Sequence, residues 1–174
     1  MSLITDEYRK MQSELHKNPQ YGISSTLFAP IVDMVIQDNQ ITELLDYGAG
    51  KCRLKDSIES KVIYTPYEPS NPLWADTPSP AEFVTCIDVL EHIEPECLDD
   101  VLDDLKRLVK KLGLFTIHTG AAQKILPDGR NAHLIQEPWK WWENKLSNRF
   151  DIVRHLVIDN GVIVLVKYKD GIWH

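Results

Sequence analysis

The sequence predicts one α/β domain, residues 1–174, built on an open and mostly parallel sheet that ends in an antiparallel hairpin. Strand-like and helix-like segments alternate along most of the chain, which is the order that a parallel sheet requires. The last two strand-like segments meet at Asp159-Asn160-Gly161, a sequence that favours a tight hairpin turn. With 174 residues, 43% of them hydrophobic, the chain can form one sizeable core.

The individual elements follow from the spacing of the apolar residues. Apolar residues at helical spacing predict helices over 5–17, 27–37, 52–58, 99–111 and 138–146. Runs of branched and aromatic residues predict strands over 41–47, 61–65, 82–87, 112–119, 151–158 and 162–169. Residues 66–80 are rich in proline and are therefore expected to form a loop.

The composition narrows the kinds of partner. With 26 acidic and 19 basic side chains the net charge is −7, so we expect no extended nucleic acid bound along its backbone. The three cysteines are odd in number and far apart, which predicts neither a disulfide framework nor a zinc site, and no metal is expected. No apolar run approaches the length of a membrane span, and we expect a cytoplasmic protein without membrane contact.

The strand over 41–47 ends in Gly48-Ala49-Gly50, a turn that lets a ligand approach the backbone closely. Glycine has no Cβ to block the ligand, and the backbone N–H groups that follow are free to bind it. The dinucleotide fingerprint needs a further glycine at position 53, where this chain has Arg53, so a nicotinamide or flavin site is disfavoured. A tight turn with no ligand is an equally good interpretation of this motif alone.

Two further motifs follow the next two strands. Glu68 comes 20 residues after Gly48, where an acidic side chain can accept hydrogen bonds from both hydroxyls of a ribose. The same spacing also suits an exposed acid in a loop. The stretch from Asp88 to Ile93 begins where a strand ends, so Asp88, Glu91 and His92 are expected at the ligand-facing edge of the sheet.

Together these motifs resemble those of class I S-adenosylmethionine-dependent methyltransferases of the small-molecule type, over about residues 41–120. The resemblance implies a Rossmann-like, mostly parallel seven-stranded sheet with a C-terminal antiparallel hairpin and helices on both faces. It also implies a helical cap at 1–40 and an acceptor-side insertion at 120–146. Cys52 stands where the family often has a third glycine.

The resemblance further implies that S-adenosyl-L-methionine is the cofactor. Asp46 and the two glycines would contact its methionine part, and Glu68 its ribose. The full set expected to bind it is Tyr21, Asp46, Gly48, Ala49, Gly50, Glu68, Asp88, Val89 and Leu90.

Methyl transfer requires alignment of donor and acceptor and, for an oxygen or nitrogen acceptor, removal of a proton, which histidine accepts most readily near neutral pH. The end of the strand over 112–119 and the segment that follows it offer four candidate catalytic residues: His118, Asp128, Arg130 and His133. Arg130 can hold a phosphate or carboxylate through two hydrogen bonds. An ordinary Asp-Gly turn with solvated polar groups is the alternative interpretation.

The sequence therefore predicts methyl transfer from S-adenosylmethionine to oxygen or nitrogen of a small polar acceptor, and Arg130 points to an anionic one. One alternative is modification of a nucleotide or nucleobase with the same cofactor. Another is a non-catalytic, methyltransferase-like binding subunit, which would keep the glycine turn and lose the acceptor-binding groups.

Overall fold

The computed structural model describes residues 2–19 and 22–169, which form a six-stranded sheet in the order β2-β1-β3-β4-β6-β5. The strands are β1 (Glu43–Tyr47), β2 (Ile63–Tyr67), β3 (Ala81–Ile87), β4 (Val109–His118), β5 (Phe150–Ile158) and β6 (Gly161–Tyr168). The first four are parallel, and β6 runs antiparallel to both β4 and β5. The predicted mostly parallel sheet with a C-terminal hairpin is confirmed.

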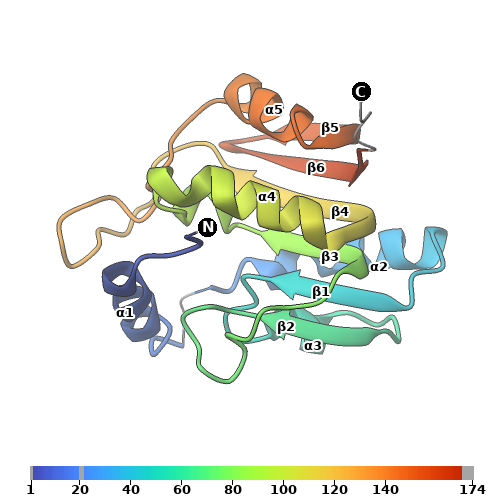
Figure 1. Cartoon of the computed structure of the whole chain (residues 1–174), viewed down its shortest axis with the longest axis horizontal. Helices are drawn as coiled ribbons and strands as arrows, with labels where there is room; N and C mark the ends of the chain where they lie inside the picture. Colours follow the sequence, from blue (N-terminus) through green and yellow to red (C-terminus); the bar gives the residue numbers. More distant parts are fainter. Residues whose placement is uncertain (1, 20–21, 170–174) are drawn as a thin grey trace.

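Helices cover both faces of the sheet, as predicted (Figure 1). They are α1 (Asp6–Leu15), α2 (Ser25–Asp38), α3 (Arg53–Ser57), α4 (Leu98–Leu108) and α5 (Trp139–Ser147), with short 3-10 turns η1 (Leu90–His92) and η2 (Pro95–Cys97). Side chains alternate between the faces along each strand, so Leu44 packs with α2 while Leu45 packs with α4 and α5. None of the helices described is long and apolar enough to cross a membrane.

The seventh strand that the resemblance implied is not present in the described part of the chain. Between β2 and β3 the chain forms turns and bends. Four prolines lie in this connection, at 69, 72, 78 and 80. Because proline has no N–H to donate to a neighbouring strand, this segment cannot form a regular ladder along the outer edge of β2.

Helix α1 lies beyond the edge of the sheet where the parallel strands end, as does the loop over 119–138 (Figure 1). Thr5 caps α1 by accepting a hydrogen bond from the N–H of Tyr8 at 3.2 Å. The N–H and hydroxyl of Thr5 both donate to the carboxylate of Glu94, at 2.9 and 2.7 Å. The Tyr8 hydroxyl donates to the backbone carbonyl of His92 at 2.6 Å. These contacts hold α1 against the segment that follows β3.

The substitution Thr5→Ala is expected to loosen α1 without disturbing the sheet. Loss of the cap is worth about 1 kcal/mol, so hydrogen exchange of the α1 amides should speed up about fivefold while that of the β4 amides stays unchanged. Thr26→Ala is the matched control. The exposed hydroxyl of Thr26, near the start of α2, donates to the backbone carbonyl of Ile23 and does not cap a helix. Unchanged exchange in α1 would show that Thr5 does not anchor the helix.

Candidate functional site

A cavity of about 780 Å³ lies where the parallel strands end. Its wall includes the ends of β1, β3 and β4, together with α1 and parts of the loop that follows β4. The chain leaves β1 for β2 on one side and then for β3 on the other, so the strand order reverses beside this cavity. Open α/β sheets bind ligands at such a reversal, and the volume suits a small organic molecule.

The glycine turn after β1 is packed tightly between two strand ends. The N–H groups of Gly48 and Ala49 donate to the carbonyl of Tyr67 at 2.8 and 3.0 Å. Gly48 has a φ of +79°, and a Cβ placed on it would lie 2.4 Å from a methyl carbon of Val89. Cys52, at the position of the family's third glycine, has a φ of +57°, a conformation that favours glycine.

Asp46, the last residue but one of β1, is a buried carboxylate on the cavity wall. It accepts hydrogen bonds from the hydroxyls of Tyr64 and Thr85, the latter at 2.9 Å. Burial raises the pKa of Asp46 to about 6, although these two hydrogen bonds act in the opposite direction. Sequence reasoning missed both hydroxyls. The parallel register, which pairs Asp46 with Thr85, is the signal that could have found the second.

Glu68 follows β2 and is also buried beside the cavity. One carboxylate oxygen accepts from the N–H and the hydroxyl of Ser70, at 3.1 and 2.7 Å. The other accepts from the N–H of Gly50 at 3.1 Å. The carboxylate is therefore held in a fixed orientation next to the glycine turn.

Asp88, directly after β3, adopts a strained backbone conformation with a φ of +51°. Its N–H donates to the carbonyl of Thr116 at 3.0 Å, and the Thr116 hydroxyl donates to its carboxylate at 2.6 Å. Such strain persists only where neighbouring contacts hold it, and it is common at functional sites.

The cavity wall carries a marked excess of negative charge. Four carboxylates line it: Asp46, Glu68, Asp88 and Glu94. Lys124 is the single lysine or arginine among the described lining residues. The site therefore favours a ligand with positive charge.

Three imidazoles lie close together on the wall of this cavity. The ring centre of His133 lies 4.6 Å from that of His118 and 4.8 Å from that of His92. Nδ1 of His92 lies 2.7 Å from the carbonyl of Ala132, and Nδ1 of His133 lies 2.7 Å from the carbonyl of Gly120. A carbonyl only accepts, so each Nδ1 carries the proton and each Nε2 keeps a lone pair. Burial lowers the pKa of His133 and lowers that of His92 to about 4.

Asn131 holds the loop that brings His133 to the cavity. Its side-chain oxygen accepts from the N–H groups of Ala122 and His133, both at 2.9 Å. Its side-chain nitrogen donates to the carbonyl of Ala122 at 2.8 Å. Further along, the N–H of Ile135 donates to the carbonyl of Glu91 at 3.0 Å, which ties the loop to η1.

The Glu91 side chain is completely buried beside these histidines. Its Oε1 accepts the N–H of His118 at 3.0 Å. Burial raises the pKa of this carboxyl well above its ordinary value, and the nearby Asp88 adds to the effect.

Most of the predicted site residues line the cavity, but not all. Those that do are Asp46, Gly48, Ala49, Gly50, Glu68, Asp88, Val89, His118 and His133. Leu90 is fully buried in the core, and Tyr21 lies outside the described residues. Asp128 and Arg130 form an ion pair with each other at 2.7 Å and do not line the cavity. Arg130 instead lies over the ring of Tyr8, 5.7 Å from its centre.

No model of a known protein family matches the sequence, and no curated protein matches it either. Its structure, in contrast, is similar to solved methyltransferases. The 1,6-didemethyltoxoflavin-N1-methyltransferase of Burkholderia thailandensis, with 1,6-didemethyltoxoflavin and S-adenosylhomocysteine bound, aligns over 98% of this chain and 92% of its own, with a TM-score of 0.70 and 14% identity.

Two other solved structures have the same fold. The N-methyltransferase NodS of Bradyrhizobium japonicum, in complex with S-adenosylhomocysteine, aligns over 95% of this chain and all of its own, with a TM-score of 0.58 and 9% identity. The 16S rRNA methylase ArmA aligns over 91% of this chain and 98% of its own, with a TM-score of 0.52 and 15% identity. The chain therefore has the Rossmann-like α/β fold of S-adenosylmethionine-dependent methyltransferases, which confirms the predicted fold class except for its count of seven strands.

The close contact between Gly48 and Val89 makes a testable prediction. Gly48→Ala should destabilise the fold by about 2–4 kcal/mol, through backbone strain and a clash with Val89. In a Val89→Ala background the cost should fall by about 1–3 kcal/mol, which a double-mutant cycle of urea unfolding measures. Gly129→Ala is the control: Gly129 has a φ of +89° and no atom near its Cβ position, so its cost should not depend on Val89. An equal cost of Gly48→Ala in both backgrounds would contradict the packing described.

The raised pKa of the buried Asp46 leads to a second prediction, which concerns how the free energy of unfolding depends on pH. Its folded-state pKa of about 6 exceeds the ordinary value of 3.8, so protonation favours folding and this contribution is lost as the pH rises through about 6. Asp46→Asn should therefore stabilise the protein by about 1–3 kcal/mol at pH 7.5, with the gain vanishing near pH 4. Thermal unfolding across this range measures it.

Asp33→Asn provides a comparison of opposite sign. The Asp33 carboxylate accepts the N–H groups of Glu59 and Ser60, both at 2.9 Å. Partial burial would raise its pKa, but these hydrogen bonds lower it, so this variant should lose stability above pH 4. If Asp46→Asn loses stability in the same way, the account of Asp46 as a costly buried charge is wrong.

Proposed function

We propose that this protein is an S-adenosylmethionine-dependent methyltransferase that acts on oxygen or nitrogen of a small polar acceptor. The observation that carries the proposal is the cavity at the strand-order reversal, where Asp46 and Glu68 flank the glycine turn. The sulfonium and ammonium groups of the cofactor are positively charged, which suits the carboxylates of this wall. The solved methyltransferases that bind S-adenosylhomocysteine in the same fold support it.

In this proposal each residue of the wall holds a different part of the cofactor. The oriented carboxylate of Glu68 accepts the ribose hydroxyls, and Asp46 with the Gly48–Gly50 backbone binds the methionine part. Val89 packs against the cofactor, with Leu90 fixed in the core beneath it. Tyr21 remains a prediction for cofactor binding. When bound, S-adenosylmethionine supplies an electrophilic methyl group.

The histidines supply the proton chemistry. In the cavity, the imidazole of His118 or His133 would take the proton from an acceptor hydroxyl or amine as that acceptor is methylated. The demethylated cofactor would be the second product. Both side chains project from backbone that is held by several hydrogen bonds, which supports a fixed orientation.

The acceptor is proposed to be small, polar and uncharged. A role of Asp128 and Arg130 in acceptor binding remains a proposal, since they can reach an anionic acceptor only after the ion pair between them opens. Four carboxylates on the wall oppose an anion. A nucleotide or nucleobase acceptor is the second candidate, favoured by the fold shared with a 16S rRNA methylase, but the net charge of −7 opposes an extended RNA.

A transfer assay tests the proposal. The protein is incubated with S-adenosylmethionine that carries a tritiated methyl group and with fractionated metabolite pools, and labelled product is isolated. We expect a small labelled product, and a decrease of about 100-fold or more in turnover for His133→Ala, the range in which loss of proton transfer falls. Cofactor affinity should stay within about twofold of wild type.

His155→Ala is the matched control, because His155 is exposed on β5, stacks on Trp139 and does not line the cavity. Its turnover should equal that of wild type. If wild type binds the cofactor but labels nothing in any pool, the non-catalytic binding subunit is the better interpretation. The position of Asp128 and Arg130 outside the cavity would then help to explain the absence of methyl transfer.

A further inference from the structure

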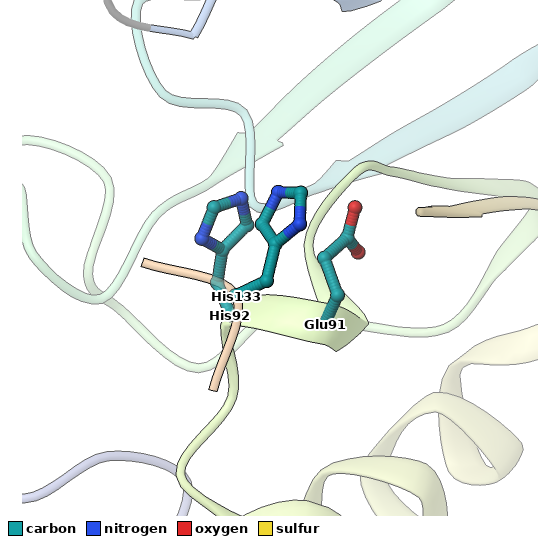
Figure 2. Close-up of side chains that lie close together, drawn as sticks. All are labelled: Glu91, His92 and His133. Carbon is teal, nitrogen blue, oxygen red and sulfur yellow. The ribbon is translucent and has the colours of Figure 1, made fainter. Parts of the chain in front are cut away.

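Glu91, His92 and His133 converge on one point although residues 92 and 133 are 41 positions apart in the chain. Each offers one ligand atom, and the three atoms all lie within 4.8 Å of one another. Figure 2 shows the two imidazoles side by side and the Glu91 carboxylate projecting to the same side of η1. A cluster of two imidazoles and a carboxylate at this separation is a candidate for metal binding.

The two imidazoles are already oriented as metal ligands are. Backbone carbonyls hold the Nδ1–H groups of His92 and His133 at 2.7 Å each. Metal-binding histidines typically donate their second ring N–H to a carbonyl or carboxylate, which fixes the ring and leaves the other nitrogen for the ion. Both rings also line the cavity, so an ion held there is accessible to a ligand.

Glu91 provides an independent observation. It is 0% exposed, and its Oε2 has no hydrogen-bond partner among the described residues. A buried carboxylate oxygen without a partner is costly, and pairing with a cation removes that cost. The neighbouring Oε1 is fixed by the N–H of His118, so the unpaired oxygen cannot rotate away without breaking that bond.

We propose that Glu91, His92 and His133 bind one divalent first-row transition-metal ion, with zinc as the representative. Two imidazoles and one carboxylate suit zinc and its neighbours, whereas Mg²⁺ and Ca²⁺ prefer oxygen ligands alone. Metal–ligand bonds of about 2.0–2.2 Å place ligand atoms about 3.5 Å apart, so the cluster closes by about 1 Å when the ion binds. The imidazole of His133 is partly exposed, so its side chain can make that movement while its backbone stays bound to Asn131.

Three protein ligands leave a position open toward the cavity, as catalytic metal sites do. A water or an acceptor oxygen can occupy it. If the proposed methyl transfer holds, the ion would orient and polarise an acceptor oxygen, and His118 would remain as the proton acceptor. That consequence rests on the proposed function, but the metal site itself does not.

Metal binding is measured without cofactor or acceptor, so its outcome is independent of the proposed function. The full chain is stripped of metal with a chelator and titrated with ZnCl₂ by calorimetry and with CoCl₂ by visible absorption. We expect one ion per chain and a Co²⁺ spectrum typical of mixed nitrogen and oxygen ligands. His133→Ala should weaken binding by about 100-fold or more, since even outer-shell changes cost 10–100-fold.

Two further variants keep the test decisive. Glu91→Gln has the same shape and can still accept from His118, so it should fold and yet lose affinity and alter the Co²⁺ spectrum. His155→Ala, on the exposed strand β5, should bind like wild type. The proposal would be overturned if His133→Ala and Glu91→Gln bound the metal as tightly as wild type does, or if wild type bound neither ion.

Discussion

The contact between Gly48 and Val89 connects the turn after β1 to the segment after β3, and the cavity depends on it. A side chain at Gly48 would overlap Val89, and the N–H groups of Gly48 and Ala49 are bound to the end of β2. Three neighbouring strand ends are thereby held in one arrangement. Asp46, Glu68 and Asp88 take their positions from these strand ends, so the charged wall follows from one tight turn.

Two buried carboxylates, one on this wall and one beside it, have a cost in stability that points to function. Asp46 and Glu91 are carboxylates that burial makes hard to ionise, and Oε2 of Glu91 has no partner in the described part of the chain. Groups of this kind are retained at sites where a ligand compensates for them. At Asp46 the proposed compensation is a cationic cofactor, and at Glu91 it is a metal ion.

The sequence predicted the strands, the terminal hairpin and the place of Glu68 well, because each depends on local periodicity or on a motif next to a strand end. The predicted seventh strand is absent from the described residues. The resemblance implied it, but the prolines after β2 cannot donate the backbone hydrogen bonds that a further strand beside β2 would need. The approach of His133 to His92 could not be predicted, since it depends on Asn131 and on backbone bonds between distant segments. The ion pair of Asp128 with Arg130 could not be predicted either, although the Asp-Gly sequence correctly indicated a turn there.

Calorimetric titration with S-adenosylmethionine, and with its demethylated product, tests the central claim that this cavity holds the cofactor. We expect one saturable site per chain and an affinity at least about tenfold weaker in Glu68→Gln, because hydrogen bonds to a charged acceptor are lost. Glu59→Gln, at an exposed position outside the cavity, should bind like wild type. No binding of either compound at millimolar concentration, or equal binding by Glu68→Gln and wild type, would contradict it.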